Sequence, residues 1–311
     1  AQAILAQAAA AVAPIAEACD VAHPIHTVGT MMSSQEVPQG WAVVTGASAG
    51  LGAALARALA VHKRLHVAGI VLVARRKDRL ERLAAEIEVA AQSSGRPCAV
   101  RVVEADLSNA DSGVRSILDS IGDLQVDILV NCAGIAASCS NFEDASTDAL
   151  NMELEVNVRA PLLLTHALLP GMLQRGRGRV LNIASIAAAI PAPFMATYGA
   201  SKAWVYSWSM ALTKELQNTP VTVTCYCPGH LATEFDNAAS SGDRLICRMP
   251  CMSEHDVDKV AKHALRCTAR GKRWATNGTI NWCNIMTTML APLGMVLAIA
   301  ARLQRTPGCR T

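Results

Sequence analysis

Six short apolar runs recur along the chain, separated by stretches that favour helix. The runs cover residues 41–44, 70–73, 99–103, 128–130, 179–183 and 221–225. Most of these runs are continuous instead of alternating, which is typical of parallel strands whose two faces are both covered. We therefore predict an α/β protein with a single doubly wound parallel sheet and helices on both faces. In such sheets ligands bind at the carboxyl ends of the strands, near the point where the strand order reverses.

A glycine-rich turn follows the first apolar run. Residues 45–52 read Thr-Gly-Ala-Ser-Ala-Gly-Leu-Gly, and the residues after them, 53–60, are strong helix formers. Glycine has no Cβ, so the backbone can approach an anion closely, and the free amides at the start of a helix stabilise negative charge. This order of strand, turn and helix predicts a pyrophosphate cradle, although a lone glycine-rich turn is ambiguous.

A tyrosine and a lysine lie four residues apart much later in the chain. Tyr198 and Lys202 share a face if this segment is helical, and Ser185 lies thirteen residues before the tyrosine. A nearby positive charge favours the phenolate and lowers the tyrosine pKa, which makes a usable general acid. Taken alone the pair is also compatible with a half-buried ring and a solvated charge on an ordinary helix.

Five motifs in register make the chain resemble the short-chain dehydrogenase/reductase superfamily, in its single-domain form of roughly 250 residues with a Rossmann-like sheet. The matching positions are Gly46, Ser48, Gly50, Leu51 and Gly52 in the T-G-x-x-x-G-x-G turn, Asp106 and Leu107 at the adenine, Asn131, Ala133 and Gly134 in N-N-A-G, Asn157, Ser185, Tyr198 and Lys202 in the catalytic tetrad, and Pro228, Gly229 and Thr233 in P-G-x-x-x-T. Cys132 departs from the motif, where the family usually has Asn. This departure puts the packing beside the cofactor in question, and not the chemistry.

The resemblance implies hydride transfer between a nicotinamide and a carbonyl carbon. Tyr198 would protonate the developing alkoxide, and Lys202 would lower the tyrosine pKa and bind the nicotinamide ribose. Ser185 would donate to the carbonyl oxygen, and Asn157 would hold a water that connects the lysine to solvent. Each residue also has a structural alternative: Ser185 as a strand-end hydroxyl, and Asn157 as a helix residue that satisfies backbone groups.

The end of the second predicted strand bears on the choice of cofactor. Family members that use NAD usually place a carboxylate there, whereas this chain has Arg75 and Arg76. Guanidinium groups match phosphate oxygens, so we expect these arginines to bind the 2′-phosphate of NADP(H). The alternative is that they merely start the charged helix over residues 77–88.

The substrate is poorly specified by the sequence. Residues 190–195 before the tyrosine are apolar, and residues 230–252 are expected to form a variable lid. An apolar pocket favours a lipophilic ketone or acyl chain, as in the 3-oxoacyl reductases and hydroxysteroid dehydrogenases of the family. Two alternatives stay open: an NADP(H)-binding protein with a structural or regulatory role, and an epimerase or dehydratase that uses the same tyrosine and lysine.

Composition adds exclusions. The formal charge is +3, and the cluster Arg175, Arg177 and Arg179 has no interleaved aromatics, so we interpret it as a solvated loop and expect no nucleic-acid partner. Eleven cysteines without a C-x-x-C pair favour a reducing intracellular compartment such as the cytoplasm. His62 and His66 have the spacing of a metal pair without an evident third ligand, and we expect no metal site.

The two ends complete the predicted organisation. We expect a poorly ordered alanine-rich extension at 1–40, a dehydrogenase domain at 41–280 and an apolar helical extension at 281–311. The N-terminal extension at 1–40 has no Lys or Arg and matches neither a secretory signal nor a transit peptide. The charge-free run 285–301 lies at the lower length limit for a membrane span, and its alternatives are a buried helix pair or peripheral membrane contact. Trp204 and Trp208 predict a homodimer or tetramer formed through the helix that begins at the tyrosine.

Overall fold

The computed structural model describes residues 40–137, 139–231, 233–235, 255–278, 281, 285 and 294–298. Nearly all of the predicted N-terminal extension and most of the predicted C-terminal extension lie outside these residues, and their assignment as separate parts stays a prediction. No helix in the described part of the chain is long and apolar enough to cross a membrane.

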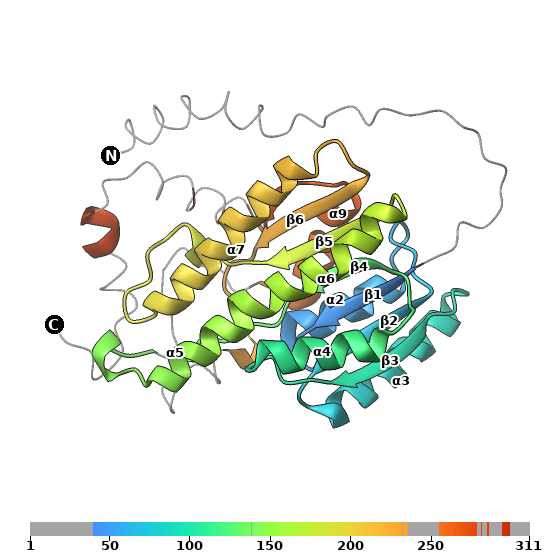
Figure 1. Cartoon of the computed structure of the whole chain (residues 1–311), viewed down its shortest axis with the longest axis horizontal. Helices are drawn as coiled ribbons and strands as arrows, with labels where there is room; N and C mark the ends of the chain where they lie inside the picture. The colour runs from blue at the N-terminus through green and yellow to red at the C-terminus, as the bar shows by residue number, and fades with distance from the viewer. Residues whose placement is uncertain are drawn as a thin grey trace. The chain divides into compact units, whose positions relative to one another are not determined.

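A single parallel sheet forms the centre of the domain (Figure 1). Within the described residues its strands are β1 Trp41–Thr45, β2 Gly69–Ala74, β3 Ala99–Glu104, β4 Val126–Asn131, β5 Gly178–Ile183, β6 Val221–Cys227 and β7 Trp274–Thr276. They lie in the order β3-β2-β1-β4-β5-β6-β7, with every neighbouring pair parallel. The predicted doubly wound fold is confirmed, and all six apolar runs are strands. The three-residue β7 is an addition that its short pattern did not reveal.

Helices cover both faces of the sheet (Figure 1). They are α2 Gly50–Ala60, α3 Lys77–Ser93, α4 Ala110–Ile121, α5 Thr147–Leu154, α6 Ala160–Gln174, α7 Ala196–Glu215 and α9 Val257–Ala269. The buried side chains form two main clusters, one between the sheet and α2, α3 and α9, the other between the sheet and α4, α6 and the end of α7. Both faces of each central strand are therefore apolar, which is why the strands read as continuous runs.

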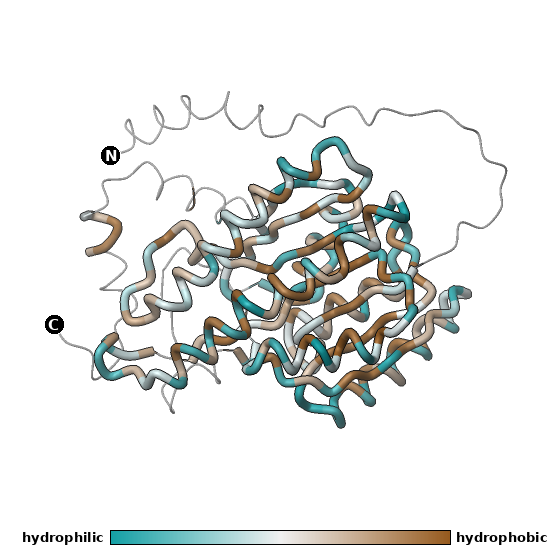
Figure 2. The backbone as a smooth tube through the Cα atoms, in the orientation of Figure 1, coloured by the Kyte–Doolittle hydropathy of each residue, from teal (hydrophilic) through white to brown (hydrophobic). Residues whose placement is uncertain are grey.

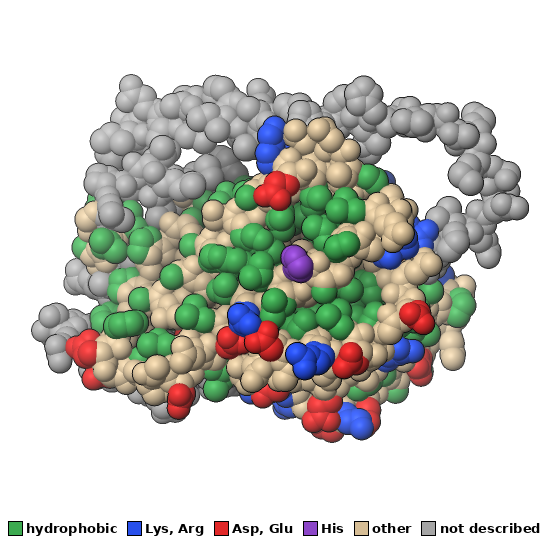
Figure 3. Space-filling view, in the orientation of Figure 1, with side chains coloured by type: hydrophobic (Ala, Val, Ile, Leu, Met, Phe, Trp, Pro, Cys, Tyr) green, Lys and Arg blue, Asp and Glu red, His purple; other side chains and the backbone are tan. Residues whose placement is uncertain are grey.

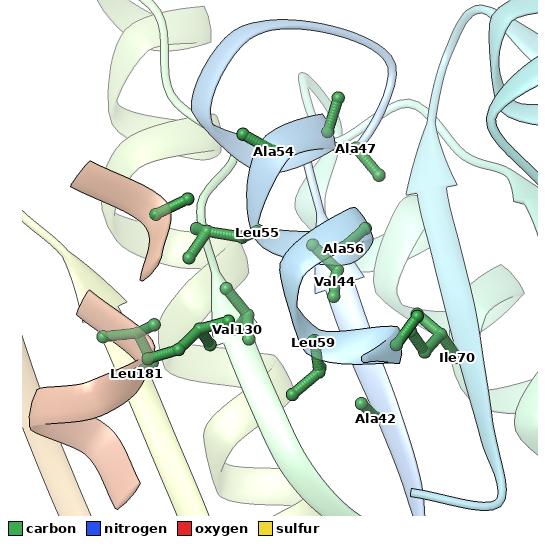
Figure 4. Packing of buried hydrophobic residues seen from close by; sticks show 14 of the residues in the cluster. Ala42, Val44, Ala47, Ala54, Leu55, Ala56, Leu59, Ile70, Val130 and Leu181 are labelled. Carbon is green, nitrogen blue, oxygen red and sulfur yellow. The ribbon is translucent and has the colours of Figure 1, made fainter. Parts of the chain in front are cut away.

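The first cluster shows how this packing is built. Leu55 and Leu59 of α2 lie against Val44 of β1, and Ile70 and Leu181 extend the contact to strands on either side (Figure 4). The backbone is brown along the strands and teal on the outer turns of the helices, as the pattern of burial requires (Figure 2). Packing on both faces thus holds the strands in place, and the site lies at the ends of these strands.

The basic cluster after α6 differs from the prediction. Arg175 and Arg177 donate to the two carboxylate oxygens of Asp127 on β4, at 3.2 and 2.6 Å, and all three side chains are at most 30% exposed. Arg179 on β5 donates to the Thr268 carbonyl at 3.1 Å, and burial lowers the pKa of its guanidinium. The expectation of a solvated loop is therefore wrong, because β4 brings a carboxylate from 48 residues away to pair with the arginines.

Candidate active site

A cavity of about 430 Å³ opens at the carboxyl ends of the strands. It straddles β1 and β4, where the strand order reverses, as expected for this fold. The predicted site residues that line it are Gly46, Ser48, Gly50, Leu51, Gly52, Arg75, Arg76, Asp106, Leu107, Ala133, Gly134, Ser185, Tyr198, Lys202, Pro228, Gly229 and Thr233. The structure thus brings nearly all of them together, and Asn131 and Asn157 lie behind the wall.

The glycine turn between β1 and α2 leaves no room for side chains. Gly46 has φ 69°, and a Cβ on it would lie 2.8 Å from the Cα of Ala133. A Cβ on Gly52 would lie 2.2 Å from the Gly46 carbonyl oxygen. Helix α2 begins at Gly50 without a side-chain cap from Ala49, so its first amides are left to an external anion. The turn has the form that a pyrophosphate requires.

The turn is tied to the loop after β4 by a threonine. The hydroxyl of Thr45 accepts hydrogen bonds from the amides of Cys132 and Ala133, at 3.0 and 3.1 Å. Burial raises the pKa of the Cys132 thiol to about 12, so the residue that departs from the family motif is uncharged. Cys132 therefore adds no negative charge near Lys202.

Asn131 belongs to a buried polar network beneath the site. Its side-chain amide donates to Thr165 at 3.1 Å and to Asn182 at 2.8 Å, and Asn182 donates to Ser209 of α7 at 2.9 Å. The network joins β4 and β5 to helices α6 and α7. It fixes the height of α7 above the sheet, and so the position of the tyrosine and lysine that this helix carries.

Tyr198 and Lys202 lie one turn apart on α7, as predicted. The ammonium nitrogen of Lys202 is 5.7 Å from the centroid of the Tyr198 ring and donates to the Ile183 carbonyl at 3.2 Å. Lys202 is only 5% exposed, and burial lowers the pKa of its ammonium group. A Cβ at position 134 would come within 3.1 Å of this nitrogen, so glycine is needed there to admit the lysine.

Ser185 and Asn157 are each held by the backbone. The Ser185 hydroxyl accepts from the amide of Ala187 at 3.1 Å at the end of β5. Asn157 sits in a π-helical turn, Glu155–Arg159, a feature common at functional sites. Its side chain accepts from the Ile135 amide at 2.9 Å and donates to the Ile135 carbonyl at 2.8 Å and to Ser201 at 3.0 Å. The asparagine therefore braces the loop after β4, and its predicted contact with a water stays a prediction.

Glu153 is a buried carboxyl that the sequence did not single out. It lies one helical turn before Asn157 and is fully buried, and neither oxygen makes a hydrogen bond of ordinary geometry within the described residues. Burial raises its pKa to about 7, and the Ala137 amide and the charge of Lys202 oppose that rise. A glutamate in a short polar helix ordinarily reads as a surface residue, so the pattern gave no signal for this one.

The arginines after β2 have a partner that was also missed. Arg76 donates to the Ser48 hydroxyl from two nitrogens, at 3.2 and 3.0 Å, and to the Glu234 carboxylate from a third at 2.7 Å. Arg79, on the first turn of α3, donates to both oxygens of the same carboxylate at 2.7 Å. These ion pairs lower the pKa of Glu234. Arg75 is exposed at the rim of the same cavity.

The segment after β6 closes the other side of the site. The amide of Gly229 donates to the side chain of Asn277, just after β7, at 2.9 Å. A Cβ on Gly229 would lie 2.3 Å from Asn281, so the close approach needs glycine. Phe235 packs its ring 5.6 Å from that of Tyr198. Of the predicted lid at residues 230–252, residues 230, 231 and 233–235 are described, and the others lie outside the described residues.

This set of features matches a known family over most of the domain. Residues 40–244 match the short chain dehydrogenase family. The chain belongs to the short-chain dehydrogenase family. A very-long-chain 3-oxoacyl-CoA reductase of Laccaria bicolor is 40% identical over 197 residues, which cover 63% of this dehydrogenase and 54% of the length of that reductase.

Solved structures agree with the assignment. A short-chain dehydrogenase from Sphingobium yanoikuyae in complex with NADPH superposes with a TM-score of 0.68 at 27% identity, over 86% of this chain and 99% of that one. The 3-ketoacyl-(acyl-carrier-protein) reductase of Brucella melitensis complexed with NADH gives a TM-score of 0.63 at 27% identity, over 76% and 96% of the two chains. The predicted family is therefore confirmed.

Proposed function

We propose that this short-chain dehydrogenase is an NADPH-dependent oxidoreductase that reduces the carbonyl group of a lipophilic substrate. The observation that carries the proposal is the convergence of Tyr198, Lys202 and Ser185 with the glycine turn on one cavity at the strand ends. These groups come from segments up to about 150 residues apart in sequence, so their meeting in one cavity is not a local accident.

The cavity fits a nicotinamide dinucleotide, which would supply the hydride. The open amides of α2 and the side-chain-free turn at Gly46 and Gly52 fit its pyrophosphate. Asp106 and Leu107 would line the adenine, and Arg76 would meet the 2′-phosphate. At the other end Leu51, Ala133, Gly134, Pro228, Gly229 and Thr233 would surround the nicotinamide half.

Proton transfer falls to the residues on α7. Tyr198 would give its proton to the carbonyl oxygen as negative charge develops there. The positive charge of Lys202 favours the phenolate that results, and in this buried setting the interaction is stronger than it would be in water. Ser185 would donate its hydroxyl proton to the same carbonyl oxygen and so hold the substrate in place.

The wall around the tyrosine favours an apolar substrate. Ile186, Ile190, Ala192, Met195 and Phe235 all line the cavity. Such a surface suits a long acyl chain or a steroid-like ketone. The similarity to the Laccaria bicolor reductase supports a 3-oxoacyl thioester as the first substrate to test.

The cofactor preference is part of the proposal. Arg75 and Arg76 offer guanidinium groups at the end of β2, and Ser48 adds a hydroxyl from the glycine turn. Charge-assisted hydrogen bonds of this kind favour a phosphorylated ribose. One structural relative is in complex with NADPH and another with NADH, so the family fold is compatible with both.

A single experiment tests the proposal. Oxidation of NADPH and NADH is followed in the presence of long-chain 3-oxoacyl-CoA and steroid ketones, in the wild type, in Tyr198→Phe and in Tyr206→Phe. Tyr206 lies two turns further along α7, outside the residues that line the cavity, so its variant controls for changes to the helix. We expect oxidation in the wild type and in the control but not in Tyr198→Phe. Cofactor binding without oxidation of either nucleotide would favour a regulatory role instead.

We also propose self-association through the face formed by α6 and α7. The rings of Trp204 and Trp208 stack with centroids 5.0 Å apart and stay half-buried, and Leu162 and Leu173 of α6 are exposed. Hydrophobic side chains gather across this face (Figure 3). Such a patch is typical of a surface that another protein covers, and a second copy of this chain is the proposed occupant.

A reducing intracellular compartment is the proposed location. Cys98, Cys132 and Cys267 are unpaired thiols, although each is at least half-buried. Burial raises the pKa of Cys98 to about 11, so this thiol is also weakly reactive. Buried, unpaired thiols of this kind support the proposal.

A further inference from the structure

Three consecutive residues after β6 contact three different parts of the site. Thr233 lies over the glycine turn, with its Cβ 3.3 Å from where a Cβ on Gly50 would be. Glu234 pairs with Arg76 and Arg79, and Phe235 packs against the ring of Tyr198. This short segment therefore connects the adenosine end of the cavity with the proton donor.

Glu234, the middle residue of the three, brings a negative charge to the place where the 2′-phosphate is expected. Its side chain is 50% exposed, and those of Arg76 and Arg79 are 43% and 37% exposed, so the cluster is open to an incoming ligand. The two ion pairs lower the pKa of Glu234. A carboxylate thus already occupies donors that a 2′-phosphate would use.

The hydrogen bonds of Arg76 show the competition directly. Two of its nitrogens donate to Ser48 and the third donates to Glu234, so each nitrogen of the guanidinium already donates one hydrogen bond. A bound 2′-phosphate carries more negative charge than a carboxylate and would draw the same donors. Arg79 holds both oxygens of Glu234 and would keep that carboxylate when Arg76 turns to the phosphate.

We propose that Glu234 sets the selectivity between NADPH and NADH by competing with the 2′-phosphate for Arg76. The inference rests on the proposed cofactor site and goes beyond it, because it assigns a role to a residue outside the glycine turn and the arginine pair. NADH has no phosphate at this position and leaves the ion pair in place. NADPH must break one ion pair, and it is therefore bound less tightly than the arginines alone would allow.

The test removes the charge of Glu234 and keeps its shape. Dissociation constants for NADPH, NADH, adenosine 2′,5′-bisphosphate and 5′-AMP are measured in the wild type and in Glu234→Gln by titration calorimetry. A matched control is Glu81→Gln, which removes one exposed carboxylate from α3, 4.0 Å from Lys77, and leaves Arg76 and Arg79 untouched. Adenosine 2′,5′-bisphosphate and 5′-AMP report on the adenosine end of the cofactor site alone. None of the four dissociation constants depends on turnover.

The expected result is a gain confined to the phosphorylated ligands. Exposed ion pairs contribute modestly, so Glu234→Gln should bind NADPH and the bisphosphate about three- to tenfold more tightly, with NADH and 5′-AMP unchanged within about twofold. The gain should shrink as the salt concentration rises, because the competing charges are exposed. Glu81→Gln should leave the ratio of the two affinities as it is in the wild type.

The outcomes separate this inference from the proposed cofactor. The ratio of NADPH to NADH affinity in the wild type tests the cofactor preference, whereas the change of that ratio in Glu234→Gln tests the competition. A ratio that stays the same in the variant would overturn the role of Glu234 even in a protein that prefers NADPH. A ratio that falls would also overturn it, since Glu234 would then be presenting Arg76 to the phosphate.

Discussion

Replacing Glu153 by glutamine should remove a pH-dependent loss of stability. Burial raises the pKa of this carboxyl from 4.5 to about 7, whereas in the unfolded chain it returns to its ordinary value. Between these two values the folded protein holds a proton that the unfolded chain has lost, so the free energy of unfolding falls as the pH rises. The pH-dependent contribution of Glu153 to the free energy of unfolding is fully present below about pH 4.5 and has been lost once the pH exceeds about 7.

The size of the loss follows from the shift. At about 1.4 kcal/mol for each pH unit, the difference amounts to roughly 3 kcal/mol at pH 7 and above. The glutamine variant titrates at neither value, so the difference in unfolding free energy between variant and wild type should grow by about this amount across the interval. Any constant cost of burying the amide adds equally at every pH and leaves the growth unchanged.

Urea unfolding measures the difference directly. Wild type and Glu153→Gln are unfolded at several pH values between about 5 and 8, and Glu88→Gln, at an exposed position on α3, serves as the control. The control should run parallel to the wild type. Parallel curves for Glu153→Gln as well would refute the reasoning, because they would mean that the buried carboxyl keeps its ordinary pKa in the folded protein.

Three further predictions concern the site and the surface. Tyr198→Phe should reduce turnover about a hundredfold to ten-thousandfold in single-turnover kinetics and leave the cofactor dissociation constant nearly unchanged, since only the proton donor is lost; full activity would remove the tyrosine from the mechanism. Replacing Arg75 and Arg76 together by alanine should weaken NADPH by about 1.5 to 3 kcal/mol more than NADH in fluorescence titrations, and equal losses would mean that the arginines only shape the start of α3. Changing Trp204 and Trp208 to serine should shift the protein toward monomers in sedimentation velocity at micromolar concentration, and a wild type that is already monomeric would contradict the proposed interface.

The strands and the glycine turn could be predicted because their causes are local. A strand covered on both faces is largely apolar. The turn before α2 needs glycine at Gly52 because a Cβ there would meet the Gly46 carbonyl oxygen of the same turn. Tyr198 and Lys202 share one helix, so their spacing predicts that they lie on the same face of it. Sequence patterns report such requirements directly.

The features that were missed depend on contacts between distant segments. Glu234 meets Arg76 across 158 residues, and no pattern on either segment indicates the pairing. Glu153 is buried by helices that pack around it, while its own short helix is polar enough to suggest a surface position. Asp127 likewise contacts the arginines after α6 because β4 and β5 pair in the sheet. Tertiary structure, and not local preference, decides the environment of each of these charges.

The family match stops at residue 244, but the sheet does not. β6 is followed in the sheet by β7, which begins at Trp274, and the Thr276 hydroxyl donates to the Cys227 carbonyl at 2.6 Å. A chain cut after residue 244 would lose this strand together with α9, whose apolar side packs on α2. The seven residues of β6 would then become an open edge with unpaired amides and carbonyls, the kind of template on which protein chains join edge to edge. A fragment trimmed to the matching residues is therefore expected to aggregate, and any dissection of this protein has to keep the chain through at least Asn277, whose side chain also holds the Gly229 amide.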